Sequence, residues 1–254
     1  YKFCLTVKCL GVNMLEKLEK FQVLLLAVVI ALGGIIAASI LTGAVSKDVI
    51  SVTGSYSQNV VSDSGTFEFE IRARKSTKPE SYAQINKQRP LVIKYLEEQG
   101  FSKDEIDVKA LRGYDTYRIS PNGMSTNQIV AFDASQRFTV RSTDVQKIKK
   151  VSTDITNLTA KGVDINVYEP SYFYSKLSDV KVKLLEEATK DAKQRASAML
   201  KATHNRVGKI QSVRMGVFQI TPVDSTNVSD MGINDTTTIE KKITSVANVT
   251  FRIK

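Results

Sequence analysis

The stretch LEEATKDAKQRA, from Leu185 to Ala196, decides how this chain folds. It lies in a longer pattern that predicts a helix from Ser178 to about Thr203. Apolar or small side chains recur along one face of this helix at spacings of three and four residues. Its alanines are small enough to let the helix axis lie close to whatever the helix covers. We predict that five residues of this face are core packing residues: Leu184, Ala188, Ala192, Ala196 and Met199.

The segments on either side of this helix alternate in the manner of strands. The clearest case is Thr66 to Lys75, where Phe67, Phe69, Ile71 and Ala73 alternate with charged residues, as in a half-buried antiparallel strand. Further strands are predicted at 49–60, 106–119, 128–141, 163–174, 209–220 and 242–253, and two further helices at 77–100 and 144–160. Pro90 is expected to kink or split the first of these helices. About seven strands and three helices without βαβ alternation indicate a single α+β domain over residues 46–254.

A second decisive feature precedes this domain. Residues 21–45 carry no charge and reach roughly 37 Å as a helix, enough to cross a hydrocarbon core of roughly 30 Å. We therefore predict a transmembrane signal anchor at 21–45 after a cytoplasmic segment at 1–20. Lys2, Lys8, Lys17 and Lys20 precede the span and only Lys47 follows closely, which places the domain outside the cytoplasm.

Two alternatives to this topology remain open. The apolar run can belong to a cleaved signal peptide, with Thr42-Gly43-Ala44 as the cleavage site. Met14 can be the true start of the chain. In either case the domain is exported, to the periplasm or the cell exterior. The small residues Ala27, Ala31, Gly34 and Ala38 recur every three or four positions and predict a face for membrane-helix packing.

The charge of the exported part bears on its partners. Four lysines and two glutamates precede residue 46, which leaves 32 basic against 24 acidic residues in the domain. A basic exported surface suits an anionic envelope polymer or lipid headgroup, and its compartment argues against nucleic acid. The charges are spread over solvated faces, so solubility explains most of them.

The sequence predicts no catalytic, cofactor-binding or metal-binding residues. Cys4 and Cys9 both precede the span, and the single histidine, His204, lies at a helix end, so the usual zinc ligand sets cannot be assembled. The residues Ser178 and Lys181 are best explained as a helix start and a solvated lysine. The loop with Asp224, Asp230 and Asp235 lacks calcium-loop spacing. We therefore expect that the protein is not an enzyme and carries no cofactor.

The helix motif also carries a family resemblance. LEEATKDAKQRA, followed by Val207-Gly208-Lys209-Ile210, resembles the SIMPL domain family, and the opening Ile50-Ser51-Val52-Thr53-Gly54 fits the order of its elements. The resemblance covers residues 48–254. It implies an exported α+β envelope protein that self-assembles into rings, with links to stress tolerance and no catalytic residues. Relatives often have a glycine where this chain reads Ala202-Thr203-His204-Asn205.

Two functions follow as hypotheses. The first is a structural protein that forms homo-oligomers at the membrane, with the last strand and the loop Thr221–Thr238 as the surface that neighbours share. A ring would close an otherwise exposed strand edge. The alternative is a module that binds an envelope polymer or lipid headgroup through its basic surface, which predicts salt-sensitive binding by a monomer.

Overall fold

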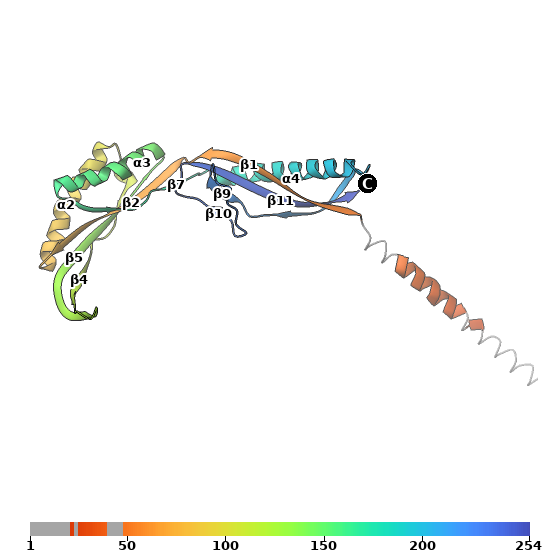
Figure 1. Ribbon diagram of the computed structural model, residues 1–254, viewed down its shortest axis with the longest axis horizontal. Helices are drawn as coiled ribbons and strands as arrows, with labels where there is room; N and C mark the ends of the chain where they lie inside the picture. Colours follow the sequence, from red (N-terminus) through yellow and green to blue (C-terminus); the bar gives the residue numbers. More distant parts are fainter. Residues whose placement is uncertain (1–20, 23–24, 40–47) are drawn as a thin grey trace, which may run out of the picture. The chain divides into compact units, whose positions relative to one another are not determined.

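The computed structural model describes residues 21–22, 25–39 and 48–254 (Figure 1). They form two compact units. The larger comprises residues 52–195 and 213–249, and the smaller comprises the described residues up to 51 together with 196–212 and 250–254.

A six-stranded antiparallel sheet lies in the larger unit. Its strands follow the order β3-β5-β2-β6, with β4 also paired to β5 and β7 to β2. The bounds are β2 (Ser64–Lys75), β3 (Ile106–Val108), β4 (Arg112–Ile119), β5 (Ser125–Ser142), β6 (Asp164–Val167) and β7 (Ser171–Phe173). The predicted alternation in β2 is confirmed: Phe67, Phe69 and Ile71 are buried, and Phe69 lies opposite Phe138 of β5.

Two helices cover the buried face of this sheet (Figure 1). Helix α2 (Lys78–Glu98) begins at Thr77, whose backbone N–H donates to Glu80 Oε2 at 3.2 Å in a capping box. Pro90 lies inside α2 without dividing it, so the predicted split is wrong. Helix α3 (Val145–Asp154) begins at Asp144 and continues as a 3₁₀ turn (Ile155–Lys161).

The core of this layer is made by both helices and the sheet. The rings of Phe69 and Phe138 stack with their centroids 4.9 Å apart. Ile85 and Leu96 of α2 and Ile148 of α3 pack in the same fully buried cluster. Burying each of these side chains stabilises the fold by roughly 1.5–3 kcal/mol.

A five-stranded sheet follows the order β1-β11-β9-β10, with β8 also paired to β11. The bounds are β1 (Val49–Val61), β8 (Val207–Met215), β9 (Gln219–Pro222), β10 (Ile233–Asn234) and β11 (Glu240–Ile253). Helix α4 (Leu177–Lys201) accompanies this sheet. In the larger unit, Thr53 of β1 hydrogen-bonds Asn248 of β11, and Ser57 bonds Thr244 at 2.8 Å. Val60, Leu184, Ile220 and Ile243 form the second core cluster.

In the smaller unit, α4 ends with a residue in an unusual backbone conformation. His204 adopts a left-handed conformation with φ of +60°, and the Asn205 N–H returns to Leu200 O at 3.0 Å. A left-handed residue after a helix is most often glycine, because a Cβ is strained there. His204 thus occupies a conformation that suits glycine better.

Replacing His204 with glycine is therefore expected to stabilise the protein by about 0.5–1 kcal/mol, by relief of left-handed strain. Urea unfolding followed by circular dichroism measures the change. Lys193→Gly, at an exposed position inside the helix, is the control and should destabilise by about 1 kcal/mol. If His204→Gly lowered the free energy of unfolding as much as the control does, the backbone at His204 would not be strained.

The fold-class prediction needs two corrections. Across residues 21–22, 25–39 and 48–254, no helix is long and apolar enough to cross a membrane. The transmembrane helix of the fold-class prediction is therefore not found among these residues, and parts of its predicted span at 21–45 lie outside them. The predicted segment 1–20 and the cleavage site at 42–44 lie outside the described residues.

The predicted number of strands is also wrong, because the described ranges contain eleven. Three predicted strands are each divided in two: 106–119 into β3 and β4, 163–174 into β6 and β7, and 209–220 into β8 and β9. Pro170 lies at the second break, where its missing N–H cannot join a ladder. The short strand β10 arises in the loop that was predicted to be irregular.

Candidate functional site

The LEEATKDAKQRA motif lies where α4 meets strand β1 in the larger unit. A Cβ placed on Gly54 of β1 would lie 2.2 Å from the backbone oxygen of Ala188 and 2.4 Å from the backbone nitrogen of Ala192. Both alanines are fully buried. The strand and the helix backbone are thus in direct contact, which only glycine on one side and alanine on the other permit.

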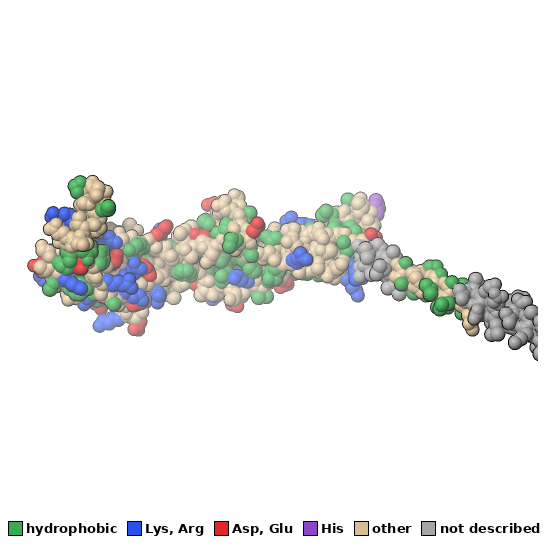
Figure 2. All heavy atoms as spheres, turned by 90° about the horizontal axis from the view of Figure 1, so that it is seen from below, with side chains coloured by type: hydrophobic (Ala, Val, Ile, Leu, Met, Phe, Trp, Pro, Cys, Tyr) green, Lys and Arg blue, Asp and Glu red, His purple; other side chains and the backbone are tan. Residues whose placement is uncertain are grey.

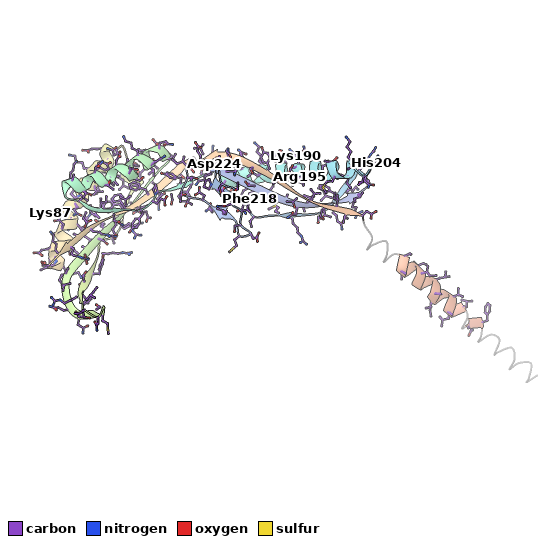
Figure 3. All side chains as sticks on the ribbon, in the orientation of Figure 1. Lys87, Lys190, Arg195, His204, Phe218 and Asp224 are labelled. Carbon is purple, nitrogen blue, oxygen red and sulfur yellow. The ribbon has the colours of Figure 1, made fainter. Side chains whose placement is uncertain are left out.

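Asp191 fixes the same contact with hydrogen bonds. The Ser55 N–H donates to Asp191 Oδ2 at 2.8 Å, and Arg195 Nε donates to the same oxygen at 2.8 Å from one helical turn further on. Figure 3 labels Arg195 on α4. The Ser55 backbone bond, followed by the bond from Arg195, lowers the pKa of Asp191. Ala188, Asp191 and Ala192 of the motif therefore each have a structural task at the strand.

Comparison with protein families agrees with this arrangement. Residues 50–253 match the family described as SIMPL, a protein of unknown function (DUF541). The chain belongs to the SIMPL family. The resemblance inferred from the helix motif is therefore confirmed. A comparison with curated proteins found no match.

The SIMPL domain also contains a buried ion pair that the sequence did not single out. Lys241 of β11 and Asp235 after β10 have side chains only 2% and 8% exposed, and Lys241 Nζ lies 3.1 Å from Asp235 Oδ2. Lys241 Nζ also donates to the Asp235 backbone oxygen at 2.8 Å. Thr237 donates its N–H at 3.0 Å and its hydroxyl at 2.8 Å to Asp235 Oδ1. Thr238 donates its hydroxyl to Oδ2.

These donors decide the charge of Asp235. Burial opposes ionisation, but hydrogen bonds from Thr238, Thr237 and Lys241 outweigh it and lower the pKa of Asp235 well below its usual range. Its oxygens are occupied by donors, so Asp235 closes the loop rather than offering ligands to a cation. Within the described residues, no group of three or more His, Cys, Asp or Glu residues is placed to hold a metal ion.

The uncovered face of the six-stranded sheet is charged. Figure 2 shows Lys and Arg side chains gathered over this part of the molecule. Three ion pairs cross or follow strands β2 and β5 there: Arg72–Glu70 at 3.0 Å, Arg74–Asp133 at 2.7 Å and Arg137–Glu68 at 3.7 Å. The Arg137 guanidinium also lies 5.4 Å from the centre of the Tyr168 ring. Opposite charges are thus interleaved on this face, and Arg72, Arg74 and Arg137 each have an acidic partner.

Two carboxylates on this face line a depression of 400 Å³. Glu68 and Glu70 stand two residues apart on β2 and point the same way. Burial raises the pKa of Glu70, but hydrogen bonds from Ser135 and Arg72 outweigh it, so the net shift is downward. A general acid at neutral pH needs a raised pKa. Glu70 is therefore held as a carboxylate that orders the arginines around it.

A group of exposed apolar side chains marks the end of the β4–β5 hairpin, which projects beyond α2 and α3 in Figure 1. We call it the hairpin surface: Tyr117, Ile119, Met124, Ile129 and Val130. Ile119 is 70% exposed. The turn between the strands is well held, because Met124 O accepts the Ser120 N–H at 2.8 Å and Gly123 takes a positive φ of 82°.

A second exposed apolar group lies around the β9–β10 loop. We call it the loop surface: Val213, Met215, Val217, Val228 and Met231. The loop is fixed to β9, since Gln219 Nε2 donates to Ser229 O at 2.6 Å. A Cβ on Gly232 would lie 3.7 Å from Val217 Cβ, which places Met231 and Val217 in one neighbourhood. Met231 is 93% exposed.

The predicted packing residues of α4 divide into two groups. Leu184, Ala188, Ala192 and Ala196 are fully buried, whereas Met199 is 57% exposed. Leu200 takes the inward position near the end of the helix. The residues Ala27, Ala31, Gly34 and Ala38 are all exposed on the described helical residues.

The remaining candidates have individual roles. The tyrosines at the end of the segment 163–174 lie in different surroundings: Tyr172 is buried in the larger core, and Tyr174 packs against the second cluster. Lys181 lies with Nζ 5.3 Å from the centre of the Phe218 ring, which Figure 3 labels. The sequence missed the hairpin surface because its apolar residues alternate as in any strand. Only the sheet order shows that nothing in the described chain covers them.

Proposed function

We propose that this SIMPL domain is a self-assembling structural module, whose hairpin surface binds the loop surface of a second copy. The observation that carries the proposal is the presence of two exposed apolar surfaces on one unit. Contiguous exposed apolar groups on a soluble domain mark interaction sites. Val228 and Met231 belong to the loop at 221–238 that the sequence offered as shared surface, which supports the same choice.

The two surfaces differ in composition and in the strands that bear them. A contact between unlike surfaces is heterologous, so repeated contacts close into a ring or continue as a filament. Strand β4 pairs only with β5 among the described strands, which leaves its other edge open for a neighbour. Assembly of this kind would cover that edge. The family resemblance and the lack of cysteine in residues 46–254 favour an extracytoplasmic location.

A charge placed on the hairpin surface is the direct test. Ile119→Lys is expected to convert the assembly to monomer, because a buried ammonium without a partner is strongly unfavourable in an apolar interface. Light scattering of the full chain at several concentrations gives the mass. Val182→Lys is the matched control, because Val182 on α4 is also 70% exposed but belongs to neither surface.

The control variant should keep the mass of the unmodified chain. A monomeric unmodified chain at all concentrations would refute the proposal. Dissociation by Val182→Lys alone would move the interface to α4.

The alternative, a monomeric module for an anionic polymer or lipid, has less support. Arg72, Arg74 and Arg137 of the uncovered sheet face are paired with carboxylates, so an anionic ligand that binds them would have to displace these carboxylates. Self-assembly is therefore the function that we propose for this domain.

A further inference from the structure

The methionines of the described chain are unusually exposed. Met124, Met199, Met215 and Met231 have exposed fractions of 62%, 57%, 60% and 93%. Methionine is ordinarily among the buried residue types, where its flexible thioether fills gaps in a core. Here the cores are built mainly from Phe, Ile, Leu, Val and Ala, and the four methionine side chains are exposed to solvent.

Exposure makes these thioethers reactive toward oxygen-donating oxidants. Oxidation converts a flexible apolar side chain into a polar sulfoxide and disrupts contacts rich in methionine. The domain from residue 46 onward contains no cysteine, so no thiol within it competes for the oxidant. Methionine is therefore the reactive sulfur of this domain.

The position of the methionines connects this chemistry to assembly. Met124 belongs to the hairpin surface, and Met215 and Met231 belong to the loop surface, so both proposed partners in the contact carry a thioether. Local hydrogen bonds hold the backbone at two of them: Ser120 Oγ donates to Met124 O at 2.7 Å, and the Met231 N–H donates to Ser229 Oγ at 3.2 Å. Met199 lies on α4 outside both surfaces.

We propose that Met124, Met215 and Met231 are oxidation sites: hydrogen peroxide oxidises them in the free chain, where they are exposed and with which the assembly exchanges, and thereby dissociates the assembly. The inference rests on the proposed self-assembly. In the reaction, the thioether sulfur attacks one peroxide oxygen, the O–O bond breaks, an S–O bond forms and water leaves. Sulfur is oxidised by two electrons and the peroxide is reduced. Each sulfoxide oxygen then has to lose hydrogen bonds with water when the interface closes, which weakens the contact.

The experiment treats the full chain with hydrogen peroxide after alkylation of Cys4 and Cys9, and follows mass by light scattering. Peptide mass spectrometry reports the addition of one oxygen atom at each methionine. We expect oxidation at all three sites and at least a roughly tenfold rise in the dissociation constant of the assembly. The triple variant Met124→Leu, Met215→Leu and Met231→Leu keeps similar apolar volume and should assemble but resist peroxide.

Met199→Leu is the matched control and should remain as sensitive to peroxide as the unmodified chain. An assembly that persists after the three sites are oxidised would overturn the inference and leave the proposed function intact. A chain that is monomeric before peroxide is added would instead overturn the proposed function itself. Equal sensitivity of the triple variant would assign the effect to other residues and refute the role of these methionines.

Discussion

Gly54→Ala is expected to destabilise the SIMPL domain by about 3 kcal/mol or more, the upper range for overpacking a tightly packed site. The new Cβ would lie 2.2 Å from Ala188 O and 2.4 Å from Ala192 N. Both atoms are backbone, so no side chain can rotate away and the helix itself has to move. That movement also strains the bond between the Ser55 N–H and Asp191.

Thermal and urea unfolding measure this loss. Gly216→Ala, directly after β8 and next to β11, is the matched control, because its Cβ would meet Val246 at an ordinary 3.4 Å. The control should change the free energy of unfolding by less than about 1 kcal/mol. Equal effects of the two substitutions would show that α4 does not press on β1 at Gly54.

Lys241→Met should cost about 3–5 kcal/mol, because it leaves the Asp235 carboxylate buried without its cation. Methionine has a similar length, so the loss reports on charge and hydrogen bonding rather than on a cavity. Lys242→Met is the control: Lys242 Nζ donates to Ser225 O at 2.8 Å but has no acidic partner in the described chain. Its expected cost is about 1 kcal/mol. Chemical denaturation at pH 7 separates the two variants.

The same ion pair sets a dependence on pH. The pKa of Asp235 is lower in the folded protein than its ordinary value of 3.8. Its contribution to stability is therefore complete above that value, and it is lost as the pH falls below 3.8 toward the folded pKa. In Lys241→Met, unfolding curves between pH 7 and pH 3 should show a shallower loss of stability than in the unmodified chain. A parallel decline in both proteins would contradict the role of the pair.

The spacing of residues in the helix motif predicted most of the buried face of α4, but not its last turn. Small residues at 188, 192 and 196 correctly indicated close packing, because periodicity is a local property of the chain. Met199 fitted the same stripe, yet the helix turns it outward near its end and buries Leu200 instead. The buried face of a helix rotates gradually around its axis along the helix. Where that face lies in the last turn depends on tertiary packing, so the spacing of apolar residues alone does not predict it.

The other differences have similar causes. The partner of Lys241 is six residues away in a polar loop, where neither helix nor strand periodicity applies. The uncharged run at 21–45 has the length of a membrane helix, but no helix suited to cross a membrane is found among the described residues. The hairpin surface required knowledge of which strands are neighbours, and that follows only from the assembled sheet.

The pairing of β1 with β11 has a consequence for how the protein folds. Thr53 and Asn248 are bonded across 195 positions of the chain, and Ser57 and Thr244 across 187. Contacts this distant slow folding, because a long loop has to be closed before they form. Strand β1 cannot complete its sheet until β11 has been synthesised. During translation β1 therefore lacks its native partner until β11 has left the ribosome, and the stability that this pairing provides is gained late.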